Sequence, residues 1–163
     1  MNENLERHAQ PAADAQSDSA PPLGGVFETA LYTEDLGAAE RFYSDVLGLK
    51  KIFSMPERLL TYRSQDSILL IFNSRRTTTE RVVINGGDVP LHGTKGAGHV
   101  AFRVAEVEMA AWRTRFRDAS VAIESEVIWP NGARSIYFRD PAGNSLELAT
   151  PNMWTKPPAD PAV

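Results

Sequence analysis

The sequence has no cysteine among its 163 residues. Disulfide bonds, thiolate catalysis and cysteine-ligated zinc or iron–sulfur centres are therefore excluded. Any bound metal must be held by His, Asp or Glu. Long apolar runs are also missing, because no segment approaches the roughly 20 apolar residues that span a bilayer. Residues 1–24 have neither the basic region nor the apolar core of a signal peptide. We expect a cytoplasmic protein that has no membrane partner.

A surplus of positive charge is also lacking. The formal net charge is -4. Residues 1–24 account for -3 of it, since they hold four acidic residues and one arginine. The rest of the chain is nearly neutral and has no dominant basic stripe. Nucleic acid is therefore not an expected partner.

Both ends of the chain are poor in residues that form a core. Residues 1–24 are rich in Ala, Gln, Asp, Ser and Pro, which predicts a disordered tail. Residues 152–163 are proline-rich and are predicted to be a C-terminal tail, from which only Met153 and Trp154 dock. A single domain is expected over residues 25–151.

Between these tails the same order of elements occurs twice. VFETALYT alternates as a strand, and Asp35 is placed to cap a helix that ends at Gly48. Three strand-like stretches follow: LKKIFS, LLTYRS and SILLIFN. The second pass consists of HVAFRV, a helix over 107–119, and the strands VAIESEVIW, ARSIYFRD and NSLELAT. An α+β fold is predicted, with two β-α-β-β-β modules at 25–76 and 97–151.

Glu28 and His99 hold equivalent places in the two passes. Each begins a strand, seven residues before an acidic candidate helix cap, Asp35 or Glu106. The alternative is that two amphipathic strand-helix stretches merely look alike. The coincidence of order, spacing and apolar helix face favours duplication.

Glu147 is the strongest single candidate for a site residue. It lies between Leu146 and Leu148 in a strand, and burying an unpaired carboxylate there is costly. It therefore needs protonation, a cationic partner or a metal. Ser135 and Tyr137 are expected to share one face of the neighbouring strand.

Glu28, His99 and Glu147 together would form a metal site. Imidazole nitrogen and carboxylate oxygen suit divalent ions, and three protein ligands leave positions open for water or substrate. Each residue has a simpler interpretation. Glu28 is solvated, His99 is a hydrogen-bonded residue at a strand end, and Glu147 forms an ion pair with Arg103 or Arg134.

Three stretches resemble the vicinal oxygen chelate superfamily, which includes glyoxalase I, bleomycin-resistance proteins, fosfomycin-resistance enzymes and extradiol dioxygenases. They are LYTEDLGAAERFYSDVLGLK, GHVAFRVAEVE and IYFRDPAGNSLELAT. The resemblance implies a curved, cup-like mixed sheet with helices outside it and a divalent ion inside. It places the ligand positions on Glu28, Leu70, His99 and Glu147. Leu70 cannot bind a metal, so a three-ligand set remains and lactoylglutathione lyase activity is not expected.

The resemblance also implies a homodimer. It leaves two arrangements open: the metal site lies within one chain, or Glu28 of one chain meets His99 and Glu147 of the other. The two carboxylates favour manganese, iron(II) or magnesium over zinc, although the sequence does not distinguish among these ions and nickel. The connection from about Thr77 to Gly98, which contains His92, is expected to be a lid or a dimer arm.

Two functions are consistent with these residues. The first is a metal-dependent lyase or dioxygenase that acts on a small oxygenated molecule, with Glu147 and Tyr137 as catalytic residues. Its expected substrate contacts are Tyr32, His92, Arg103, Trp129, Ser135 and Tyr137. The second is a metal-free binding protein of the bleomycin-resistance type, whose apolar cup is lined by Tyr32, Phe72, Trp129 and Tyr137. The joint presence of His99 and Glu147 favours the enzyme.

Overall fold

The computed structural model describes residue 20 and residues 22–155, and every structural statement below concerns these residues. Among them, no helix has both the length and the apolar character needed to cross a membrane. Most of the predicted N-terminal tail and most of the predicted C-terminal tail lie outside the described residues.

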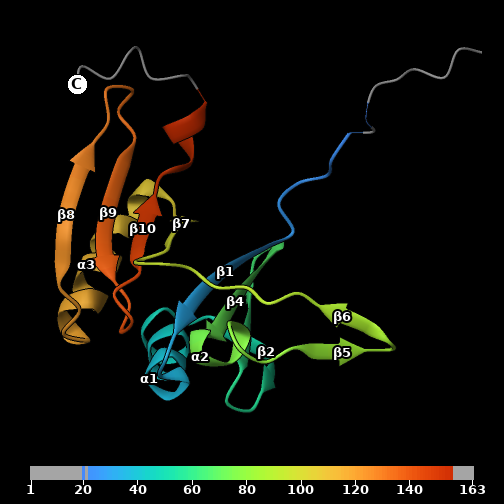
Figure 1. Ribbon diagram of the computed structural model, residues 1–163. Coiled ribbons are helices and arrows are strands. Elements are labelled where there is room, and N and C mark those ends of the chain that lie inside the picture. Colours follow the sequence, from blue (N-terminus) through green and yellow to red (C-terminus); the bar gives the residue numbers. More distant parts are fainter. Residues whose placement is uncertain (1–19, 21, 156–163) are drawn as a thin grey trace, which may run out of the picture.

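The first module forms a four-stranded mixed sheet (Figure 1). Its strands are β1 (Glu28–Thr33), β2 (Lys50–Met55), β3 (Leu59–Ser64) and β4 (Ser67–Asn73). The strand order is β1-β4-β3-β2, in which β1 and β4 run parallel and the other pairs run antiparallel. All four predicted strands are confirmed.

The second module repeats this arrangement with β7 (His99–Arg103), β8 (Ile123–Ile128), β9 (Arg134–Arg139) and β10 (Ser145–Ala149). The strand order β7-β10-β9-β8 matches the order of the first sheet, and β7 is parallel to β10. The predicted α+β fold of two β-α-β-β-β modules is confirmed.

A side-chain hydrogen bond lies at the start of the helical segment in each module. In the first module, Asp35 accepts a hydrogen bond from the Ala38 amide at 2.9 Å, as predicted, and helix α1 (Leu36–Arg41) continues into the π-helical turn η1 (Phe42–Val46). In the second module the predicted cap is wrong. The Glu108 carboxylate accepts from the Ala105 amide, while Glu106 pairs with Arg134. The 3-10 turn η2 (Glu106–Glu108) leads into α3 (Met109–Asp118).

The helices of both modules share one core. Phe138 of the second sheet packs against Phe42 of the first helical segment and against Phe116 of α3, with ring centroids 6.4 and 4.5 Å apart. Arg115 of α3 donates to the backbone carbonyls of Asp45 and Val46. Each sheet therefore presents one face to this shared core and leaves its other face open. These open faces carry the predicted site residues.

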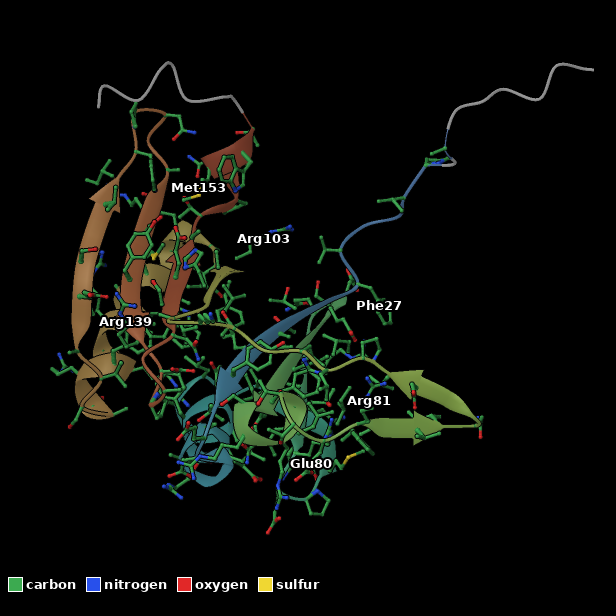
Figure 2. The ribbon with its side chains drawn as sticks, viewed as in Figure 1. Phe27, Glu80, Arg81, Arg103, Arg139 and Met153 are labelled. Atoms are coloured by element: carbon green, nitrogen blue, oxygen red, sulfur yellow. The ribbon has the colours of Figure 1, made fainter. Side chains whose placement is uncertain are left out.

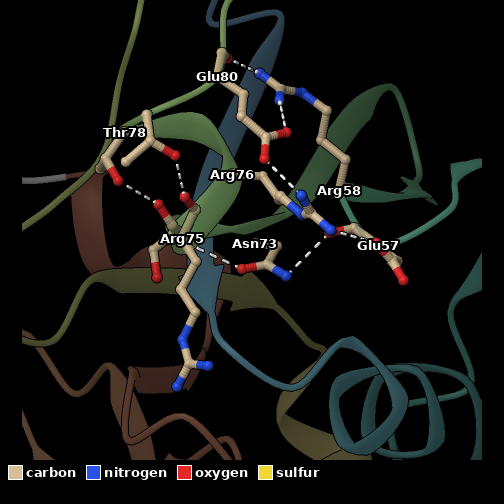
Figure 3. Close-up of polar contacts among 9 residues, drawn as sticks. Glu57, Arg58, Asn73, Arg75, Arg76, Thr78 and Glu80 are labelled. Carbon is tan, nitrogen blue, oxygen red and sulfur yellow. Dashed lines mark hydrogen bonds and ion pairs between the residues drawn. The ribbon is translucent and has the colours of Figure 1, made fainter.

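The connection between the modules contains elements that the sequence pattern did not predict. The short helix α2 (Ser74–Thr77) follows β4 directly, and β5 (Val82–Ile84) pairs with β6 (Gly87–Val89) in a hairpin that projects away from both sheets (Figure 1). Ion pairs join Arg76 to Glu57 and Glu80 at the base of this connection (Figure 3). These pairs are solvent-exposed, so we assign them a structural role.

Candidate metal and substrate site

The strand registers show which residues of the two sheets are equivalent. Glu28 pairs with Ile68 at the start of the β1–β4 ladder, and His99 pairs with Ser145 at the start of the β7–β10 ladder. Two residues further along β4 and β10 lie Leu70 and Glu147. Leu70 is thus the counterpart of Glu147, as the family resemblance implied.

Glu147 is buried on the open face of the second sheet, where only 5% of its side chain is exposed. The Ser135 hydroxyl donates to its Oε1 at 2.5 Å, and Trp129 Nε1 donates in turn to Ser135 Oγ at 2.8 Å. The predicted alternative partners lie elsewhere, since Arg134 pairs with Glu106 and no ion pair is found between Arg103 and Glu147 among the described residues. Its other oxygen, Oε2, faces His99.

His99 is held so that one ring nitrogen is directed at Glu147. Its Nδ1 lies 3.1 Å from the Ser145 carbonyl oxygen, which can only accept, so this hydrogen bond assigns a proton to Nδ1. Nε2 lies 3.3 Å from Glu147 Oε2. A neutral imidazole would then point a lone pair at an anionic oxygen. Three states satisfy this arrangement: a protonated Glu147 that donates to Nε2, a protonated His99 paired with the Glu147 carboxylate, or a cation shared between the two atoms.

The turn before β10 positions His99. Asn144 is buried, its Oδ1 accepts from the Gly98 amide at 2.9 Å, and its Nδ2 donates to the Tyr32 carbonyl at 3.0 Å. A Cβ atom on Gly98 would lie only 2.7 Å from the Leu31 side chain. A larger residue before His99 would therefore require the Leu31 side chain to shift. The same turn is tied to the first module by Tyr43, which donates to Asp140 Oδ2 at 2.8 Å.

Tyr137 lies across the β9–β10 ladder from Glu147. Partial burial, and then the nearby Glu147 carboxylate, raise the pKa of its phenol. The phenol therefore keeps its proton at neutral pH and can donate it to a ligand oxygen. Ser135, predicted to contact substrate, instead has its hydroxyl engaged between Trp129 and Glu147.

The remaining predicted contacts lie on the first module or between the modules. Tyr32 and His92 meet on the open face of the first sheet, with the Tyr32 hydroxyl 2.8 Å from His92 Nδ1 and the His92 ring edge-on to Phe72. Burial, and then the charge of Arg58, lower the pKa of His92. Arg103 is exposed and projects between the modules (Figure 2), where it lines a wide groove rather than the surroundings of Glu147.

Glu28 lies on the first sheet, on the open face that also holds Tyr32, and it is exposed. No group of three His, Asp or Glu side chains converges anywhere in residues 22–155 of a single chain. One chain therefore brings together two of the three predicted ligands, His99 and Glu147.

These two residues fit a shared divalent ion. Ligand atoms that each lie about 2.1 Å from one ion are roughly 3.0–3.4 Å from each other, and Nε2 and Oε2 are 3.3 Å apart. A histidine that binds metal usually donates its other N–H to a carbonyl or carboxylate, as His99 does to Ser145. The donor set is thus suitable but incomplete within one chain.

Comparison with known proteins agrees with this architecture. A model of the glyoxalase/bleomycin resistance protein/dioxygenase superfamily matches residues 25–148. The chain belongs to this superfamily. The predicted resemblance is thereby confirmed.

Solved structures of the superfamily align over most of the chain. Lactoylglutathione lyase from Agrobacterium tumefaciens is 38% identical, with a TM-score of 0.75, and the match covers 83% of this chain and all (100%) of that one. A glyoxalase/bleomycin resistance protein/dioxygenase from Nocardioides is 25% identical, with a TM-score of 0.61 and coverage of 80% and 85%. A fosfomycin resistance protein from Mesorhizobium loti, at 18% identity and a TM-score of 0.54, shows the shared fold alone over 80% and 93% of the two chains. No protein with a curated description matches the sequence.

The sequence pattern did not indicate that the C-terminal turn forms part of the site of this superfamily member. The 3-10 turn η3 (Pro151–Trp154) brings Met153 and Trp154 to the pocket beside Glu147. Both residues were expected to dock, but as part of a tail. The only available signal was the presence of two large apolar residues in an otherwise polar, proline-rich segment.

Proposed function

We propose that the protein is a divalent-metal-dependent enzyme acting on a small oxygenated organic molecule, and that it works as a homodimer. The observation that carries this proposal is the buried Glu147 carboxylate, which faces His99 Nε2 at 3.3 Å with no other cationic partner among the described residues. A carboxylate this deeply buried is stabilised by a bound cation.

The third ligand in this proposal is Glu28 of a second copy. Within one chain, Glu28 lies on the open face of the other sheet, and both open faces point away from the shared core. Pairing the first face of one chain with the second face of its partner would complete two identical sites in a symmetric dimer. Phe53, which is exposed on the first face, would gain a neighbour in that dimer.

The residues of the site have separate roles. His99, Glu147 and the partner's Glu28 would hold manganese, iron(II), magnesium, nickel or zinc. When bound, such an ion stabilises negative charge on two neighbouring substrate oxygens. Ser135 fixes the orientation of Glu147, and Tyr137 donates its phenolic proton to a substrate oxygen. This proposal covers lyase and dioxygenase chemistry alike. Lactoylglutathione lyase activity is not carried over from the Agrobacterium relative, because Leu70 occupies one of the four ligand positions of the family and cannot bind a metal.

A mixing experiment tests both the metal and the shared site. Glu28→Ala and His99→Ala proteins are each expected to lose stoichiometric Mn²⁺ binding in calorimetric titrations. Unfolding and refolding them together should restore about a quarter of the sites, since half of the dimers are mixed and each mixed dimer has one intact site. A mixture of the Glu28→Ala and Glu147→Ala proteins should likewise recover about a quarter of the metal sites. No recovery in either mixture contradicts the shared site, and absence of metal binding by the unaltered protein contradicts the enzyme.

A metal-free binding protein is the second candidate. It is favoured by the apolar open face of the first sheet, where Tyr32, Phe72 and His92 pack together. Tight binding of a bulky aromatic ligand by protein that takes up no metal would support it.

A further inference from the structure

A pocket of about 140 Å³ lies directly beside Glu147. Its walls come from three places in the chain: the residues that follow β8, the neighbouring strands β9 and β10, and the C-terminal turn η3. The lining residues are Trp129, Asn131, Tyr137, Glu147, Met153 and Trp154.

Most polar atoms of these walls are already used within the protein. Trp129 Nε1 donates to Ser135. The Asn131 side chain donates to the carbonyls of Asn152 and Met153 and accepts from the Ala133 amide. The walls therefore offer a ligand two indole rings and a thioether. The hydrogen-bonding groups left for a ligand are the Tyr137 hydroxyl and the Glu147 end of the pocket.

The size of the pocket limits what it can hold. An apolar cavity of roughly 150 Å³ accommodates one benzene molecule, and this pocket is about 140 Å³. Flat rings stack favourably on tryptophan and tyrosine. Trp154 is 81% exposed although it lines the pocket, so it lacks a packing partner on one side. A bound ring would supply that partner.

We infer that the substrate carries one aryl group next to its two chelating oxygens, and that this ring occupies the pocket formed by Trp129, Met153 and Trp154. The inference rests on the proposed function for the placement of the oxygens at His99 and Glu147. It adds the substrate class: a small, singly ringed aromatic compound with two neighbouring oxygen atoms.

A matched pair of ligands tests this inference. Benzohydroxamate and acetohydroxamate present the same two neighbouring oxygens and differ only by phenyl in place of methyl. With Mn²⁺-loaded protein, calorimetry should show benzohydroxamate binding roughly 10- to 100-fold more tightly, from the additional apolar surface buried. Equal affinity for the two hydroxamates overturns the aryl pocket and leaves the metal site standing.

Two substitutions test whether this pocket causes the preference for benzohydroxamate over acetohydroxamate. Trp154→Ala should reduce the preference for benzohydroxamate at least threefold, while acetohydroxamate affinity and Mn²⁺ stoichiometry stay unchanged. Val107→Ala is the matched control, because Val107 is also a highly exposed apolar residue of the second module but lies outside the pocket. An unchanged preference in Trp154→Ala overturns the assignment.

Binding of an aromatic ring in the pocket can be tested separately from binding of a metal. If the protein binds no metal, quenching of tryptophan fluorescence by benzohydroxamate, lost in Trp154→Ala, still supports the pocket while the enzyme proposal fails. Absence of quenching in that metal-free protein overturns both.

Discussion

The open faces of the two sheets share one backbone plan and differ in chemistry. Glu28, Leu70 and Thr61 occupy the places that His99, Glu147 and Tyr137 occupy on the second face. On the first face Leu70 lies at the centre, beside the Tyr32, Phe72 and His92 rings. On the second face a buried carboxylate lies there, with its own hydrogen-bond support. The two sheets thus repeat one scaffold, and different residues at a few equivalent positions give one face packed rings and the other a buried carboxylate.

The two faces also differ in how their last turns are used. The turn between β3 and β4 is short and borders the groove between the modules. The turn between β9 and β10 has an exposed tip but buried ends, Asp140 and Asn144, through which it binds the first module and places His99. The module that carries the buried acid is therefore also the module whose turn fixes the junction.

Replacing Glu147 by leucine, which copies the first face onto the second, should have the largest effect. Loss of a ligand should weaken Mn²⁺ binding by more than about 100-fold, since even the partners of metal ligands cost about 10- to 100-fold. The free energy of unfolding should change by less than about 2 kcal/mol, because a buried charge is exchanged for an apolar group. Calorimetric titration and urea unfolding measure the two quantities.

Glu147→Gln is the matched control, which keeps the shape and loses the charge. It should also lose metal affinity while remaining folded. Retention of full Mn²⁺ affinity in both variants would show that Glu147 is an internal structural acid.

Tyr43→Phe tests the junction. Burial, and then the charge of Asp140, raise the pKa of Tyr43, so its hydroxyl stays protonated and donates to Asp140. Removing this bond to a buried carboxylate should lower the free energy of unfolding by about 1.5–3 kcal/mol. Tyr62→Phe is the matched control, because the Tyr62 hydroxyl is buried and has no hydrogen-bond partner among residues 22–155. An equal loss in both variants would contradict the assigned role of the Tyr43–Asp140 bond.

His92→Phe should have the smallest effect, and that effect depends on pH. Burial and Arg58 lower the pKa of His92 in the folded protein below its ordinary value of 6.5. As the pH falls through about 6.5, the unfolded chain takes up a proton that the folded protein resists, so the unaltered protein loses stability. Phenylalanine keeps the ring contacts and does not titrate. The melting temperature of the variant minus that of the unaltered protein should therefore increase as the pH is lowered from 8 to 5. A constant difference would contradict a lowered pKa for the partly buried His92.

Much of the site was visible in the sequence because it depends on short-range patterns. Strand alternation placed Glu147 between two leucines with Ser135 and Tyr137 across from it, and the ladder of β9 and β10 confirms this neighbourhood. The cap at Asp35 and the turn at 140–144 follow from local chemistry in the same way. The β5–β6 hairpin escaped prediction because its three-residue strands are too short to show alternation.

The amino-acid sequence by itself determined the duplicated modules and the residues that share each sheet face, because these depend on patterns that are local in the chain. Three motif-bearing stretches of the sequence carried the resemblance to the family. Only the tertiary structure decided that Ser135 supports Glu147, that His99 directs Nε2 at it, and that Met153 and Trp154 complete its pocket. These contacts join segments far apart in the chain, and their partners are chosen by how the sheets and η3 pack. No local pattern encodes that choice.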